Sequence, residues 1–360
     1  MPYPRHSAAP RWIPVAVTLT LLVAACGGAK KAAQSPPVSA GTSTSGASST
    51  STAPAPPPVA PLTGDAQPDA AKLGRVSMAV KIDNVDDARP QAGLDAADVV
   101  YEEMVEGRVT RLIAVFQSTD AALIGPVRST RTTDINVVSS LNHPLYSYSG
   151  GNANYVAQLR AAPVVDVGAD AHGGAYVRSG PHGAPHNLYT STGGLLGLAP
   201  KGSGPPPAMF SYRAGGQPST AAGAVAASHL DLNFGFSSAS WDWDAASQTW
   251  KRGQNGSADV LQSGQQIAAS DVIVQVVPYT TDGFASGEGI SPPPAIPKGQ
   301  TVGSGNAVIM TGGMVIHAKW TKTAPTAVTQ FTDVSGQPIL LAPGRTWIEL
   351  APEGTAANVH

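Results

Sequence analysis

Cysteine is almost absent from this chain of 360 residues, which contains a single one, Cys26. One thiol cannot form an intramolecular disulfide, so the folded part has to be stabilised by a packed core. Charged residues make up only 13% of the sequence, and the formal net charge is −2. A nearly neutral chain gives no electrostatic basis for binding nucleic acid, so we predict no nucleic-acid partner.

The sequence also lacks the short motifs that mark several common catalytic sites. It contains no His-Glu-x-x-His, Gly-x-Ser-x-Gly, Gly-x-x-x-x-Gly-Lys or Ser-x-x-Lys pattern. Zinc hydrolases, α/β-hydrolases, P-loop NTPases and penicillin-binding enzymes are therefore disfavoured. We predict no cofactor and no metal, and favour a binding protein over an enzyme.

Two groups of side chains leave alternatives open. Asp166, Asp170 and His172 could supply metal ligands, as could the pair His182 and His186, but ordinary loop polarity accounts for all of them. The tryptophans of the second half could stack on sugar rings, although aromatic residues at strand spacing more often belong to the core.

The N-terminal segment has the composition of a secretory signal. Arg5 and Arg11 lie ahead of an apolar stretch at 12–25, and no acidic residue precedes that stretch. This stretch is shorter than the roughly 20 residues of a transmembrane helix. The run Val23-Ala24-Ala25-Cys26 resembles the lipobox of bacterial lipoproteins. The resemblance implies that 1–25 is removed, that Cys26 carries diacylglycerol, and that the lipid holds the chain on the outer, extracytoplasmic face of the cell membrane.

Composition divides the remainder of the chain into three regions. Residues 26–72 are mostly Ala, Ser, Thr, Pro and Gly, so we predict a disordered tether. Residues 73–232 are predicted to form an α/β domain, and residues 233–352 a β-rich domain. The fold class predicted is α+β, with a mixed α/β N-terminal domain followed by a smaller, β-rich antiparallel C-terminal domain.

Local patterns support this division. The first region combines strand patterns with helical spacing. Strands are predicted at 76–82, 99–105 and 111–117, and helices at 133–141 and 154–161. Each helix is followed by a short predicted strand, at 145–148 and 164–167. An Ala-rich segment at 220–229 predicts a small helix. The second region has strand patterns, with a clear hairpin at Gly312-Gly313.

Charged residues concentrate in one quarter of this charge-poor chain, in loops restricted by Pro and Gly. Arginine forks suit carboxylate or phosphate groups, and neighbouring carboxylates can hold the forks in place. Structural ion pairs that pin loops to the sheet are the alternative interpretation. The candidate ligand-binding residues are Asp83, Asn84, Arg89, Glu102, Glu106, Arg111, Arg128, Arg131, His186 and Asn187.

Several ordered blocks resemble the YerB-like lipoprotein family, a domain of unknown function. They are Lys81-Ile82-Asp83-Asn84, Ala88-Arg89-Pro90-Gln91-Ala92-Gly93-Leu94, Gly125-Pro126-Val127-Arg128-Ser129-Thr130-Arg131 and Ala184-Pro185-His186-Asn187-Leu188-Tyr189. The β-rich end, with Pro343-Gly344-Arg345-Thr346-Trp347-Ile348, resembles the C-terminal domain of that family. Arg108 departs from the pattern, since the family usually has a second glycine there. The resemblance implies a two-domain extracytoplasmic lipoprotein and no established activity.

Three functions are compatible with these features. We favour a tethered binding or accessory protein of the cell envelope, in which arginines contact an anionic cell-wall ligand or an envelope protein. A cell-wall hydrolase would instead use Asp83, Glu102 or Glu106 as acid and base with the help of His186. A structural adaptor would have no small-molecule site.

Overall fold

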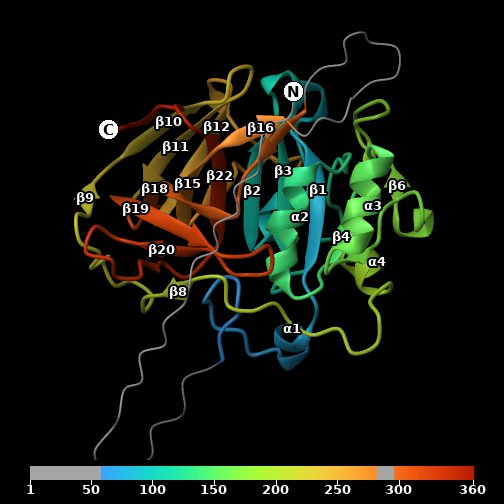
Figure 1. The fold of residues 1–360 in the computed structure, drawn as a ribbon, viewed down its shortest axis with the longest axis horizontal. Helices are drawn as coiled ribbons and strands as arrows, with labels where there is room; N and C mark the ends of the chain where they lie inside the picture. The colour runs from blue at the N-terminus through green and yellow to red at the C-terminus, as the bar shows by residue number, and fades with distance from the viewer. Residues whose placement is uncertain (1–57, 282–295) are drawn as a thin grey trace, which may run out of the picture. The chain divides into compact units, whose positions relative to one another are not determined.

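One large sheet organises the computed structural model, which describes residues 58–281 and 296–360 (Figure 1). The sheet has 11 strands, drawn from both halves of the sequence. Ten of them follow one another in the order β20 (Gln330–Thr332), β19 (Met314–Lys322), β18 (Gly303–Thr311), β15 (Asp271–Val277), β22 (Thr346–Pro352), β2 (Val99–Met104), β3 (Thr110–Phe116), β1 (Met78–Asp83), β4 (Leu145–Ser147) and β5 (Val165–Asp166). The strand β9 (Val225–Ala226) pairs with β19.

Strand β22 joins the two halves of the sequence within this sheet. It runs parallel to β15 on one side and parallel to β2 on the other. Most of its residues are buried, as are those of β2 and β15, because each strand is covered on both faces. The α+β class is confirmed, and the two predicted regions contribute to one continuous sheet of mixed orientation.

A second sheet of six strands packs on one face of the large one. Its strands are β13 (Ser257–Ala258), β12 (Thr249–Gln254), β11 (Ser238–Asp244), β10 (His229–Asn233) and β23 (Ala357–Val359), with β14 (Ala268–Ala269) paired to β12. Three smaller pairs are β16 (Tyr279–Thr281) with β17 (Pro297–Gly299), β21 (Leu340–Leu341) with β8 (Ser211–Tyr212), and β6 (Val177–Arg178) with β7 (Leu188–Tyr189).

Helices cover the opposite face of the large sheet over its β1–β4 part (Figure 1). These helices are α2 (Thr132–Val138) and α3 (Ala153–Ala161). The helix α4 (Thr192–Leu196) instead contributes Leu195 to the core shared with the second sheet, and α1 (Ala70–Gly74) buries no residue. Alternation along β3 separates two cores: Ile113 packs with Val138 of α2, while Leu112 belongs to the core shared with Trp241 of the second sheet. Within residues 58–281 and 296–360, no helix is long and apolar enough to cross a membrane.

The local strand and helix predictions agree with the structure in most places. The hairpin around Gly107 joins β2 to β3, and Gly312-Gly313 joins β18 to β19, with both glycines in the left-handed conformation. The predicted helix at 220–229 is wrong. Gly223 has φ +80, which interrupts a helix, and Val225–Ala226 extends to pair with β19.

Both ends of the folded part lie beyond the predicted boundaries. The prediction of disorder is wrong for residues 58–72, because Leu62 is fully buried and its carbonyl accepts a hydrogen bond from the Tyr212 hydroxyl at 2.6 Å. At the other end, β23 follows the predicted limit at 352 and pairs with β10. The rest of the predicted tether, Cys26 included, lies outside the described residues, as does the predicted signal peptide.

Candidate functional site

The candidate site lies at one end of the large sheet, where β1 ends and the β2–β3 hairpin turns. Asp83, the last residue of β1, is paired with Arg111 of β3, and Arg111 is paired with Glu103 of β2. Directly paired residues project from the same face, so all three side chains lie on the face covered by α2. Backbone bonds from Asp83 N to the Pro126 carbonyl and from Arg128 N to the Lys81 carbonyl, both 2.9 Å, attach the loop that carries Arg128.

Asp83 is the centre of this arrangement. Its carboxylate is only 1% exposed, and Oδ2 lies 2.9 Å from Arg128 Nε and 2.8 Å from His186 Nδ1. Its other oxygen accepts the backbone N–H of Asn84 at 3.0 Å. The Arg128 contact is an ion pair without hydrogen-bond alignment, because Nε has no hydrogen-bond partner. One buried carboxylate therefore holds an arginine and a histidine from two distant loops.

A second carboxylate, Glu106, lies beside this group in the hairpin turn. Arg131 binds it in a two-pronged manner, with Nε 2.8 Å from Oε2 and Nη2 2.7 Å from Oε1. Burial alone would raise the pKa of Glu106, but the hydrogen bonds and charge of Arg131 outweigh it and hold the pKa below its ordinary value. Glu106 is therefore ionised at neutral pH.

Arg111 completes the group from β3. Its Nη1 donates to the Ser129 carbonyl at 2.9 Å. Burial and, next, the positive charge of Arg131 lower the pKa of Arg111 to about 10, although Asp83 and Glu106 act in the opposite direction. The guanidinium stays charged at neutral pH. We call Asp83, Glu106, Arg111, Arg128, Arg131 and His186 the arginine site.

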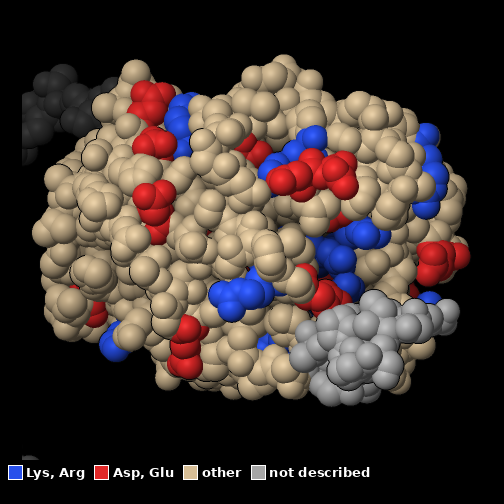
Figure 2. Space-filling view, turned by 90° about the horizontal axis from the view of Figure 1, so that it is seen from above, with Lys and Arg blue, Asp and Glu red and all other residues tan. Residues whose placement is uncertain are grey.

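The arginine site is accessible from the surface. The side chains of Arg128 and His186 are 24% and 20% exposed. Figure 2 looks onto this end of the molecule and shows Lys/Arg and Asp/Glu atoms side by side within a hollow of the surface. Six of the ten predicted ligand-binding residues come together here, from four separate stretches of the sequence.

A fully buried ion cluster lies beneath the site on the same face. The ammonium of Lys81 bonds Glu103 Oε1 and lies 2.7 Å from Asp134 Oδ1. The other oxygen of Asp134 accepts the backbone N–H of Arg131 at 2.7 Å and the Tyr146 hydroxyl at 2.6 Å. This contact fixes the backbone of a site arginine to the core of the sheet.

One cation cannot balance two carboxylates in this interior. Burial would raise the pKa of Asp134, but Lys81 and several hydrogen bonds keep it below its ordinary value. Burial and the negative charge of Asp134 raise the pKa of Glu103 to about 8. Glu103 is therefore protonated at neutral pH, and Asp134 is the ionised partner of Lys81.

Glutamine in place of Glu103 is expected to remove a pH-dependent loss of stability. Between about 4.5 and 8 the folded state keeps a proton that the unfolded state has released, so this group lowers stability as the pH rises. As the pH rises through this window, the free energy of unfolding of Glu103→Gln should increase relative to that of the wild type by up to about 1.4 kcal/mol per pH unit. Urea unfolding at pH 5 and pH 8 measures it, and a constant difference between the two proteins would contradict the assignment.

The structure places Glu102 and Asn84 on the other face of the sheet. Glu102 is fully buried, and its Oε2 accepts Arg252 Nη2 at 2.6 Å, while Oε1 accepts the Thr110 hydroxyl at 2.7 Å. Asn84 Nδ2 also donates to Glu102, at 3.2 Å. Neither side chain joins the arginine site, since adjacent strand residues point to opposite faces.

Arg252 was not among the predicted residues, although it is fully buried between the two sheets. It is bound by Glu102 and Asp259, and its guanidinium carbon lies 4.8 Å from the Trp347 ring. Arg252 is two residues after buried Trp250 on β12, so both side chains point to the same inward face. This spacing is the signal that the sequence contained. Its partners are distant in the sequence, and nothing local identifies them.

The remaining predicted residues have other partners. Arg89 pairs with Asp86 and donates to the Asn84 carbonyl at 3.3 Å. The side-chain oxygen of Asn187 accepts Arg178 Nη1 at 2.7 Å. Of the three tryptophans considered for stacking on sugar rings, Trp241 and Trp250 are fully buried in the core, and Trp243 is partly buried against it. Among residues 58–281 and 296–360 no group of three or more His, Cys, Asp and Glu side chains is placed to hold a metal ion.

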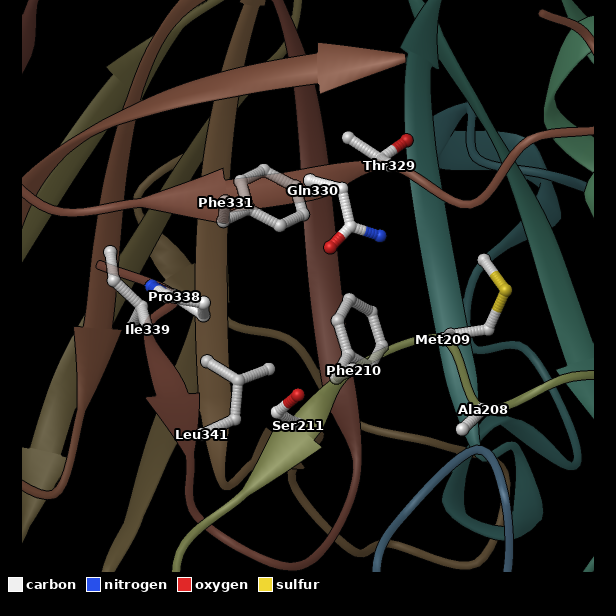
Figure 3. Close-up of a pocket in the computed structure, with 10 residues that line it drawn as sticks. All are labelled: Ala208, Met209, Phe210, Ser211, Thr329, Gln330, Phe331, Pro338, Ile339 and Leu341. Atoms are coloured by element: carbon white, nitrogen blue, oxygen red, sulfur yellow. The ribbon is translucent and has the colours of Figure 1, made fainter. Parts of the chain in front are cut away.

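A cavity elsewhere on the molecule is small and uncharged (Figure 3). It has a volume of about 140 Å³, against the roughly 300 Å³ or more of ordinary ligand pockets. Its ten lining residues, among them Phe210, Phe331 and Leu341, carry no charge. The cavity lies by β8, β20 and β21, away from the arginine site, and offers little recognition chemistry.

The carboxylates of the hydrolase hypothesis are all paired. Asp83 is engaged by Arg128 and His186, Glu106 by Arg131, and Glu102 by Arg252. An acid–base pair needs two carboxyl groups that face a substrate with separated pKa values. The geometry supports recognition of an anion by arginines better than it supports hydrolysis.

Comparison with known proteins gives the family. Residues 62–203 match the family described as "Protein of unknown function (DUF3048) N-terminal domain", and residues 230–348 match the DUF3048 C-terminal domain. YerB of Bacillus subtilis (strain 168), whose name is that of a lipoprotein, is 26% identical over 311 residues, or 83% of this chain and 88% of YerB. The crystal structure of YerB shares the fold, with a TM-score of 0.69 and 22% identity, and covers 83% of this chain and 99% of that one. The chain therefore belongs to the DUF3048 family, as its ordered sequence blocks predicted.

Proposed function

We propose that this protein is a lipid-anchored, extracytoplasmic binding protein whose arginine site recognises an anionic group of the cell envelope. The observation that carries the proposal is the convergence of Arg111, Arg128 and Arg131 around only two carboxylates at an accessible end of the sheet. Three guanidinium groups against two carboxylates leave one positive charge in excess, and arginine forks match oxyanions in shape.

The anchoring part of the proposal rests on the sequence. The lipobox-like run ends at Cys26, the single cysteine of the chain. The similar Bacillus subtilis protein bears the name of a lipoprotein. Acylation of Cys26 would hold the folded part on the outer face of the membrane, with residues 27–57 of the low-complexity segment in between.

Replacing Arg128 by alanine is expected to weaken anion binding by at least about tenfold, since hydrogen bonds to charged groups are among the stronger ones. The probe is inorganic phosphate, titrated into the detergent-solubilised full chain by calorimetry at constant ionic strength. Arg160→Ala is the matched control, because Arg160 is an exposed arginine paired with Asp166 outside the site. Phosphate binding that is equal in the wild type and both variants would overturn the proposal.

A further inference from the structure

The chemistry of a ligand can be narrowed by asking which donors of the arginine site are already used. Each of the three nitrogens of Arg131 already has a partner, since Nε and Nη2 contact Glu106 and Nη1 donates to the Thr130 carbonyl at 2.7 Å. Arg111 gives one hydrogen bond, to the Ser129 carbonyl. Within residues 58–281 and 296–360, Arg128 has its ion pair through Nε, and its two terminal nitrogens have no protein partner. The donors left for a ligand therefore belong chiefly to Arg128 and Arg111.

The charge of the site limits the charge of that ligand. Arg131 and Glu106 neutralise each other in their two-pronged contact, and Asp83 neutralises Arg128. Arg111 has no carboxylate partner of its own among the described residues. A single negative charge on the ligand balances this surplus, whereas a second one would meet Asp83 and Glu106 without a partner.

His186 adds an acceptor beside these donors. A carboxylate in an ion pair only accepts hydrogen bonds, so the hydrogen between Asp83 Oδ2 and His186 Nδ1 lies on the histidine. In the neutral ring this leaves Nε2 as an acceptor. The Asp83 carboxylate, which is fixed to the sheet, holds the His186 ring. The His186 side chain remains partly exposed.

Resting on the proposed function, we infer that the ligand of the arginine site is a singly charged oxyanion with a hydroxyl group close to it. The oxyanion would lie on Arg128 and Arg111, and the hydroxyl would donate to His186 Nε2. Hydroxy-carboxylates and phosphodiesters of polyols share this chemistry. A bare anion would leave the histidine acceptor without a donor.

Two matched pairs of probes test the inference at pH 8: glycolate against acetate, and bis(2-hydroxyethyl) phosphate against diethyl phosphate. Removing the hydroxyl is expected to weaken binding about five- to tenfold, the usual effect of one hydrogen bond. Whichever of the two hydroxylated probes, glycolate or bis(2-hydroxyethyl) phosphate, binds with the higher affinity shows whether the oxyanion is a carboxylate or a phosphodiester. Equal affinities within both pairs, with binding still dependent on Arg128, would overturn the inference and leave the proposed function intact.

His186→Ala separates the two parts of the recognition. This variant should lose the preference for glycolate over acetate. His182→Ala, four residues away on the same loop, is the control and should keep that preference. Melting temperatures of both variants check that the loop remains folded. Retention of the glycolate preference by a folded His186→Ala would contradict the role of Nε2, and failure of all four probes to bind would overturn the proposed function as well.

Discussion

Replacing Arg252 by methionine is expected to lower the free energy of unfolding by about 3–5 kcal/mol, the usual effect of removing one partner from a buried ion pair. Arg252 is fully buried between the two sheets and binds Glu102 of β2 and Asp259. Methionine fills much of the volume, so the expected loss comes from two carboxylates left in the interior without their cation. Urea unfolding followed by circular dichroism measures the change.

The surroundings of Arg252 explain why the effect should be large. Burial, and then the negative charge of Glu102, raise the pKa of Glu349 well above its ordinary value. Its Oε1 accepts the Trp241 indole N–H at 2.9 Å. Arg252 also lies against the rings of Trp347 and Trp241, at 4.8 and 5.9 Å from their centroids. It is the cation that links the second sheet to β2.

Two controls separate this explanation from a general loss of charge. Arg160→Met removes an exposed arginine from its pair with Asp166 and should leave stability unchanged. Combining Arg252→Met with Glu102→Gln and Asp259→Asn should recover a large part of the loss, because the uncompensated charges are then gone. An Arg252→Met protein as stable as the wild type would contradict the account of how the two sheets are held together.

Cys26→Ala is expected to abolish lipid attachment completely. The thiol is the only cysteine sulfur in the chain, so no other residue can replace it in a thioether to diacylglycerol. Cells that express the wild-type protein should incorporate labelled palmitate into it, and the variant should carry no label. Ser35→Ala, in the predicted tether, should be labelled like the wild type. Labelled palmitate on the Cys26→Ala protein would show that the lipobox-like run was misinterpreted.

The local parts of the fold could be predicted from the sequence. The strands β2, β3, β15, β18 and β19 have apolar or alternating residues over most of their length, and glycines mark the turns at Gly107 and Gly312-Gly313. The position of β22 between β15 and β2 could not be predicted. It depends on contacts between residues about 250 positions apart, such as Val99 with Thr346, to which local periodicity gives no access.

The errors have similar physical causes. The Ala-rich segment at 220–229 has good helix propensity, but pairing of Val225 with β19 outweighs it. Leu62 lies in a segment of low complexity, and its burial under Tyr212 is a tertiary effect. In both cases a contact with a distant part of the chain decides a conformation that the local sequence leaves open.

The candidate site was predictable in its composition and only partly in its geometry. Arginines and carboxylates near Pro and Gly indicated Asp83, Arg128, Arg131 and His186, and the structure brings these together. Period-2 alternation already required Glu102 and Glu103 to face opposite sides, so no single site could hold both. Which of them faces the arginines depends on strand register, which the sequence does not reveal.

A crystal structure of the protein grown with glycolate tests the central claim most directly. The account predicts the glycolate carboxylate within about 3 Å of the terminal nitrogens of Arg128, beside Arg111, and its hydroxyl at a similar distance from His186 Nε2. The ion pair between Asp83 and Arg128 should remain in place. An arginine site that stays empty at saturating glycolate, and equally at saturating bis(2-hydroxyethyl) phosphate in a parallel crystal, would contradict the account.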